Sequence, residues 1–108
     1  MYEYKARVGR IVDGDTVDLY VDLGFNITTK IRGRLINVDT PERGHEDWAK
    51  ATAKFRDLLR VAADVDFENP DDEWWITIKT AKTGKFGRWL VDIEGVNDIL
   101  AQTWPYKR

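Results

Sequence analysis

The chain contains no cysteine and only one histidine among its 108 residues. Without cysteine it can form neither disulfides nor thiolate metal sites, and its redox compartment is left open. The one histidine, His45, lies in the polar sequence RGHED, ahead of a helical pattern. We therefore expect His45 at the surface or at the start of that helix, and not as an acid or base in catalysis.

Long hydrophobic runs are also missing. No stretch of about 18 apolar residues occurs, so we expect no membrane-spanning helix and no membrane partner. The first residues, MYEYKARVGR, carry charge from the third position and lack the apolar segment of a secretory signal. We expect a protein that is cytoplasmic or is released on lysis.

Neither sign of charge dominates the chain. The net charge is only −2, which provides no general attraction to polyanions. What the chain does have is a hydrophobic fraction of 43% and five tryptophans, which indicate a folded globule. At 108 residues, with no linker or repeat, it should form one domain over residues 1–108, and we expect a monomer.

Alternation and turn residues predict a meander of three strands at the start of the chain. Residues 4–12 form the first strand, and Asp13-Gly14 marks a tight hairpin turn. Residues 16–23 alternate apolar and polar side chains, as a half-buried strand does. The third strand should cover residues 27–38, with Gly33 marking a bulge or bend of the kind that closes barrels.

The apolar period then changes to that of a helix, over residues 46–63. Trp48 belongs to the apolar stripe of this helix, so we expect it in the core. Trp74, Trp75 and Trp89 lie in strand patterns. For these three, alternation favours packing in the core or on a barrel face over stacking on nucleic-acid bases.

The last third of the chain predicts two more strands and a short helix. A turn at residues 69–72 precedes the strands at residues 74–80 and 87–93. Residues 96–102 form the helix, with Asn97 as its cap or turn residue. The order β-β-β-α-β-β-α predicts an α+β, mainly β fold: a five-stranded OB-type barrel with two helices.

The segment RLINVDTPE, residues 34–42, begins like a core strand yet carries charged groups. In a purely structural interpretation, Asp39-Thr40-Pro41 ends a strand and Asp13-Gly14 only makes a turn. In a meander, however, Asp15 at one turn and Asp39 at a strand end can lie close together. Two carboxylates with nearby backbone carbonyls suit a hard divalent cation. Arg34 and Arg88 could bring guanidinium groups, whose paired donors match a phosphoryl group.

Four segments together resemble the staphylococcal nuclease (thermonuclease) family, which are small calcium-dependent phosphodiesterases built on an OB barrel. They occur in the family's order and with similar spacing over nearly the whole chain. They are VDGDTV (12–17), RLINVDTPE (34–42), GKFGRWL (84–90) and GVNDIL (95–100).

The resemblance implies a role for each matching residue. The metal would be Ca²⁺, with Mg²⁺ or Mn²⁺ as alternatives because free calcium is scarce inside cells. Its ligands would be the carboxylates of Asp15 and Asp39 and the carbonyl of Thr40. The scissile phosphate would be held by Arg34 and Arg88, and the general base would be Glu42. The nucleotide's terminal phosphate and base would be contacted by Lys85 and Phe86.

The implied reaction is hydrolysis of the DNA or RNA backbone by in-line attack of water on phosphorus. Family members often carry tyrosine where this chain has Phe86, so a hydroxyl contact is lost while stacking is kept. The alternative is a noncatalytic OB module that binds single-stranded nucleic acid. Such a module has no need of the acids and arginines, and their presence favours the enzyme. A third class, domains that read modified arginine, needs an exposed aromatic cage that no sequence pattern indicates.

Overall fold

The computed structural model describes residues 2–63, 73–83 and 88–106. The element order is the predicted β-β-β-α-β-β-α. The predicted turn at residues 69–72 lies outside the described residues. Among the described residues, no helix is both long and apolar enough to cross a membrane. The elements are β1 (Tyr2–Asp13), β2 (Thr16–Asp22), β3 (Thr28–Leu35), α1 (Trp48–Ala62), β4 (Trp75–Thr83), β5 (Trp89–Ile93) and α2 (Asn97–Thr103).

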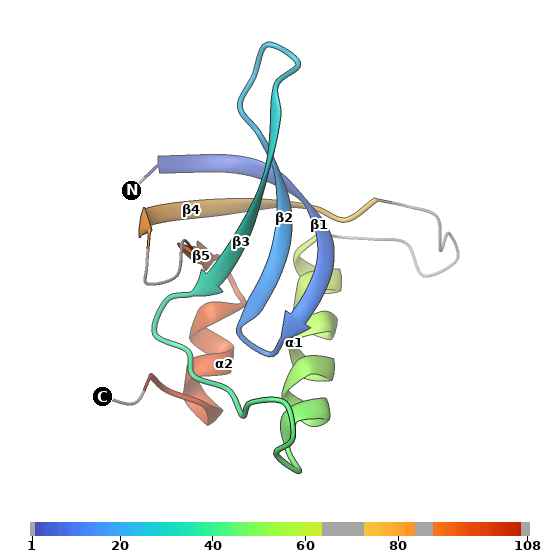
Figure 1. The fold of residues 1–108 in the computed structure, drawn as a ribbon, viewed down its shortest axis with the longest axis vertical. Coiled ribbons are helices and arrows are strands. Elements are labelled where there is room, and N and C mark those ends of the chain that lie inside the picture. Colours follow the sequence, from blue (N-terminus) through green and yellow to red (C-terminus); the bar gives the residue numbers. More distant parts are fainter. Residues whose placement is uncertain (1, 64–72, 84–87, 107–108) are drawn as a thin grey trace.

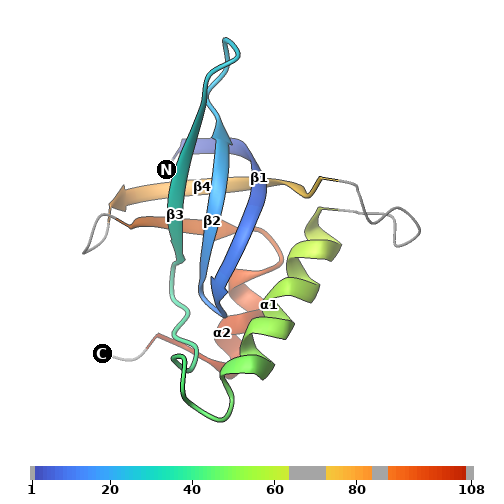
Figure 2. The ribbon, with the colours of Figure 1, turned by 45° about the vertical axis from the view of Figure 1, so that its right-hand side comes forward.

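The five strands form a closed barrel in the order β1-β2-β3-β5-β4, with β4 pairing back to β1. All neighbours are antiparallel except β3 and β5, which run parallel. Both helices lie at one end of the barrel, opposite the tip of the β2–β3 hairpin (Figures 1 and 2). The α+β fold with an OB-type barrel is therefore confirmed.

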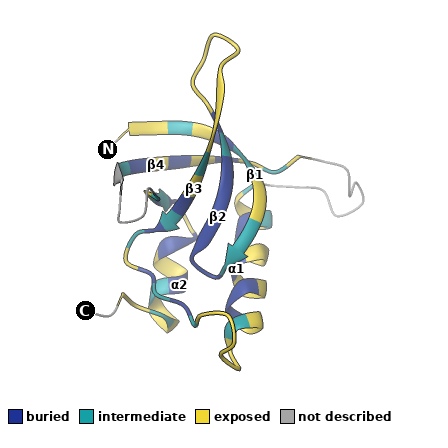
Figure 3. Cartoon of the chain, viewed as in Figure 1, coloured by how far each residue is buried: buried dark blue, intermediate teal, exposed yellow. Residues whose placement is uncertain are grey.

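Inward-facing side chains of the strands and the apolar stripe of α1 build one core. Alternation in β2 buries Val17, Leu19 and Val21, while α1 contributes Phe55 and Leu59. In Figure 3 buried residues run along β2 and recur in β4 and in both helices. Closing the sheet on itself removes both sheet edges and leaves the turns at the helix end free to carry a site.

The third strand is shorter than predicted. It ends at Leu35 and not at residue 38, because Asn37 adopts a left-handed backbone with φ of 65° that cannot continue a strand. Val38 makes only an isolated bridge to Pro105. Asp39 therefore follows a turn and is not at the tip of a strand.

Of the bulge or bend predicted at Gly33, the bulge is absent. Gly33 pairs with β2 in continuous register, opposite Val17. A Cβ at this position would lie 3.1 Å from a methyl of Val91 and 3.3 Å from one of Leu19, so glycine leaves room for the core. The register shifts lie instead between Val8 and Asp13 of β1 and between Thr80 and Thr83 of β4.

The tryptophans lie closer to the surface than a core position requires. The prediction for Trp48 was wrong: it is half-buried and lies outside the core cluster, because its indole Nε1 donates a hydrogen bond of 2.7 Å to Asp13 at the barrel end. Trp75 and Trp89 are 42% and 38% exposed, so neither belongs to the core. Of Trp74, Trp75 and Trp89, only Trp74, which directly precedes β4, packs against the core. His45 is exposed before α1, as predicted.

Asn97 is not the cap of its helix, since that position is Val96 and no side chain caps it. Asn97 is only 4% exposed, and its side chain ties three segments together. Its Oδ1 accepts from the Ile93 N–H at 2.9 Å, and its Nδ2 donates to the carbonyls of Ile36 and Val91, both at 3.0 Å. This side chain fixes the turn after β3 against β5.

Replacing Asn97 by alanine is expected to lower the free energy of unfolding by about 2–4 kcal/mol. The change leaves the buried Ile93 N–H and the part-buried Ile36 carbonyl without partners, whereas the Val91 carbonyl keeps the bond from the Ile36 N–H. Urea denaturation measures the change. Gln102→Ala, at an exposed position of the same helix, should stay within about 0.5 kcal/mol of wild type, and an equal loss in both variants would contradict the role of Asn97.

Candidate functional site

A pocket of about 170 Å³ is formed where the β1–β2 turn meets the loop after β3. Three separate segments line it: the β1–β2 turn, the end of β3 with the loop that follows, and the residue before β5. Its lining residues are Asp13, Asp15, Arg34, Asp39, Thr40, Pro41, Glu42 and Arg88.

The β1–β2 hairpin positions Asp15 in this pocket. Asp13 pairs with Thr16, so the turn itself consists of Gly14 and Asp15. A Cβ on Gly14 would lie 2.9 Å from the Thr40 Oγ1, so glycine lets the turn pack directly on the following loop. The buried Asp15 carboxylate accepts from the Thr16 hydroxyl at 2.9 Å and from the Thr40 N–H at 3.1 Å. The turn and the loop are thereby held together.

Arg34 lies between two carboxylates. Its NH1 is 3.4 Å from Asp15 Oδ2, and its NH2 is 3.5 Å from Asp39 Oδ1. The same NH1 donates to the carbonyls of Val38 and Leu35, at 2.5 and 3.1 Å. With its side chain only 15% exposed, this guanidinium is fixed at the back of the pocket.

Arg88 and Glu42 complete the pocket from opposite segments. Arg88 is half-buried and directly precedes β5, which runs alongside β3. Glu42 is exposed, and within the part of the chain that is described its carboxylate makes no hydrogen bond or ion pair. Glu42 is thus available to a small molecule such as water, while Arg34 and Arg88 offer cationic donors.

The pocket carries an excess of negative charge. It is lined by four carboxylates and two guanidinium groups, a formal charge of −2. Beside it, Arg32 pairs with Asp18 at 3.0 Å, and this hydrogen bond, with the charges of Asp18 and Asp13, raises the pKa of Arg32. That pair joins β3 to β2 but adds no group to the pocket.

The oxygen groups of the pocket fit a hard, hydrated cation. Among the described residues, no three acidic or histidine side chains cluster closely enough to hold a metal by themselves. Asp15 and Asp39 could supply two carboxylates, and among the described residues no donor hydrogen bonds to the Thr40 carbonyl. The Thr40 hydroxyl is buried without a partner beneath Gly14, so the carbonyl is the better ligand. Water would complete the shell, as Ca²⁺ and Mg²⁺ both permit.

The structure brings together six of the eight residues that the sequence pointed to: Asp15, Arg34, Asp39, Thr40, Glu42 and Arg88. The other two, Lys85 and Phe86, lie outside the described residues. Sequence reasoning did not place Asp13 or Pro41 in the pocket. Asp13 could have been found, because it is separated from Asp15 only by the glycine of a tight turn.

Comparison with known proteins assigns no family. No protein-family model matches the chain, and no curated protein sequence matches it.

Proposed function

We propose that this protein is a metal-dependent phosphodiesterase of the staphylococcal nuclease type, which hydrolyses the backbone of DNA, RNA or both by in-line attack of water on phosphorus. One observation carries the proposal: two arginines line the same 170 Å³ pocket as the carboxylates of Asp15, Asp39 and Glu42. Cation ligands and phosphate ligands in one small space are what metal-assisted phosphodiester hydrolysis needs.

Asp15, Asp39 and the Thr40 carbonyl would hold the cation, which we propose to be Ca²⁺, with Mg²⁺ or Mn²⁺ possible. When bound, the cation supplies Lewis-acid polarisation of a nonbridging phosphate oxygen. The formal charge of −2 in the pocket favours cation binding before the phosphate arrives. With its NH1 bonded to the Leu35 and Val38 carbonyls, Arg34 would offer its NH2, which lies 3.5 Å from Asp39 Oδ1, to phosphate oxygens.

Arg34 and Arg88 would then stabilise the negative charge that gathers on the equatorial oxygens in the transition state. Preorganised donors of this kind are each worth about 10²–10³ in rate. Arg34 is preorganised by its bonds to the Leu35 and Val38 carbonyls. Glu42 would orient the attacking water and take its proton. Lys85 and Phe86 would contact the terminal phosphate and base of the nucleotide.

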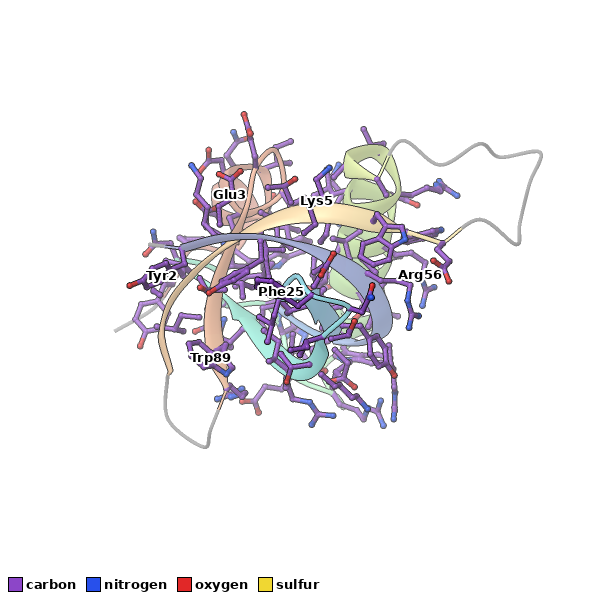
Figure 4. The ribbon with its side chains drawn as sticks, turned by 90° about the horizontal axis from the view of Figure 1, so that it is seen from above. Tyr2, Glu3, Lys5, Phe25, Arg56 and Trp89 are labelled. Carbon is purple, nitrogen blue, oxygen red and sulfur yellow. The ribbon has the colours of Figure 1, made fainter. Side chains whose placement is uncertain are left out.

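A noncatalytic module that binds single-stranded nucleic acid is the second candidate. The exposed ring of Trp89, directly after Arg88, favours it, because exposed aromatic rings stack on bases without needing any catalytic group. Trp89 is labelled in Figure 4, where it lies at the edge of the barrel. Both candidates bind nucleic acid, and only one of them cleaves it.

Cleavage of single-stranded DNA and RNA across a panel of divalent cations separates the two candidates. We expect Ca²⁺, Mg²⁺ or Mn²⁺ to support cleavage and a chelator to abolish it, because the reaction then loses the Lewis acid that polarises a phosphate oxygen. In the matched control, an excess of the cation is added back to the protein in chelator, and the rate of cleavage should recover. Intact substrate under every cation and pH, with binding retained, would establish the noncatalytic module instead.

A further inference from the structure

A second and larger depression lies away from the candidate site, between β1 and α1. Its volume is about 530 Å³, and we call it the arginine groove. Three arginines and one glutamate line it, for a formal charge of +2 on a chain whose net charge is −2. The lining residues are Arg7, Val8, Gly9, Arg10, Ile11, Arg56, Glu73 and Trp74.

An irregularity of β1 places Arg10 in this groove. Val8 pairs with Leu19 and Ile11 with Val17, so β1 has one more residue than β2 over this stretch. Val8 and Ile11 both pack against the core, and the extra residue falls at Gly9 and Arg10. A bulge of this kind re-aims a side chain that regular alternation would send elsewhere.

Arg7 is held in place by an aromatic ring. Its guanidinium carbon lies 4.3 Å from the ring centroid of Tyr20, within cation–π distance. A Cβ on Gly9 would lie 2.9 Å from the same ring, so glycine allows Tyr20 to lie flat against β1. Among the described residues, the nearest carboxylate oxygen is that of Glu73, 4.0 Å from the Arg7 Nε. Arg7 is therefore positioned chiefly by Tyr20.

Arg10 and Arg56 have their full donor capacity available. Both are exposed, and within the described segments neither side chain makes a hydrogen bond or an ion pair. In Figure 4 Arg56 extends outward beside β1 and the start of β4. Guanidinium groups without carboxylate partners, brought together in a concave surface, are suited to the paired oxygens of a phosphate.

We propose that the arginine groove binds a second backbone phosphate of the nucleic-acid strand whose scissile phosphate lies in the 170 Å³ pocket; this rests on the proposed function. Arg10 and Asp13 are three residues apart on β1, and Asp13 lines that pocket. At the spacing of a strand their Cα atoms are about 10 Å apart. OB folds bind roughly 4–16 nucleotides, so a strand must extend well beyond one small pocket. The groove supplies a positively charged continuation on the same strand of the barrel.

The test compares the double variant Arg10→Ala/Arg56→Ala with Lys5→Ala/Lys79→Ala. The second pair removes the same charge from exposed positions outside both pockets. Binding of a single-stranded oligonucleotide of about 12 nucleotides is measured in chelator over a salt series, so that no cleavage occurs. The arginine variant should bind about tenfold more weakly, and its salt slope should fall by about 0.7 for each lost phosphate contact.

The outcomes separate the groove from the proposed function. Equal losses in the arginine and lysine variants would overturn the groove, because general charge would then explain the binding. The proposal would also be overturned if the arginine variant lost affinity for anionic lipid vesicles while its binding of the oligonucleotide stayed intact. If the wild type cleaves no substrate but its binding still depends on Arg10 and Arg56, the proposed function fails and the groove stands.

Discussion

Glu42→Gln is expected to lower kcat for phosphodiester cleavage by roughly 10²–10⁴, the range typical of a lost general base. Glutamine keeps the size of the side chain but accepts no proton, so water is still bound and no longer activated. Because Glu42 is exposed and bonds to no described side chain, the fold should be unaffected. Steady-state kinetics on a chromogenic dinucleotide ester, with circular dichroism and a melting curve, measure both effects.

Glu46→Gln is the matched control for this experiment. Glu46 lies four residues further along, is also exposed, and does not line the pocket. The same charge is lost, so Glu46→Gln should keep kcat within about twofold of wild type. A rate for Glu42→Gln equal to that of the control would remove Glu42 from the mechanism, leaving the two arginines and the bound cation as its remaining parts.

The fold could be predicted because its signals are local. The alternation of Val17, Leu19 and Val21 fixes which face of β2 is inside, and the helical period from Trp48 onward cannot be mistaken for a strand. Where prediction failed, a single residue overrode the pattern. Asn37 ends β3 three residues early by adopting a left-handed backbone, although Ile36 and Val38 continue the apolar pattern of a strand.

For the candidate site, the sequence could predict which residues take part but not how they are arranged in space. Barrel closure brings β5 beside β3, and this parallel pairing carries Arg88 to the pocket. The position of Arg34 between two carboxylates depends on side-chain geometry, and no motif encodes it. The arginine groove was missed although the bulge leaves a mark in the sequence: Val8 and Ile11 both pack against the core at a spacing of three residues, where regular alternation would need two.

Adding Ca²⁺, Mg²⁺ or Mn²⁺ is expected to raise the melting temperature of the wild-type protein, and Asp15→Asn should abolish the rise. A cation at one hundred times its Kd stabilises the folded state by about 2.7 kcal/mol. For a domain of this size that corresponds to a shift of about 10–20 °C. The asparagine side chain would keep the shape but not the charge of a ligand that is only 7% exposed, and cleavage should fall by at least about 10².

Thermal melts of each variant with and without cation make the comparison, so each variant is its own reference. Asp47→Asn, at an exposed position outside the pocket, controls for the lost charge and should melt like wild type in both conditions. If Asp15→Asn retains the full cation-induced shift, the cation binds elsewhere on the chain. The carboxylates that flank Arg34 would then serve only to hold that guanidinium in place, and the proposed chemistry would lose its metal.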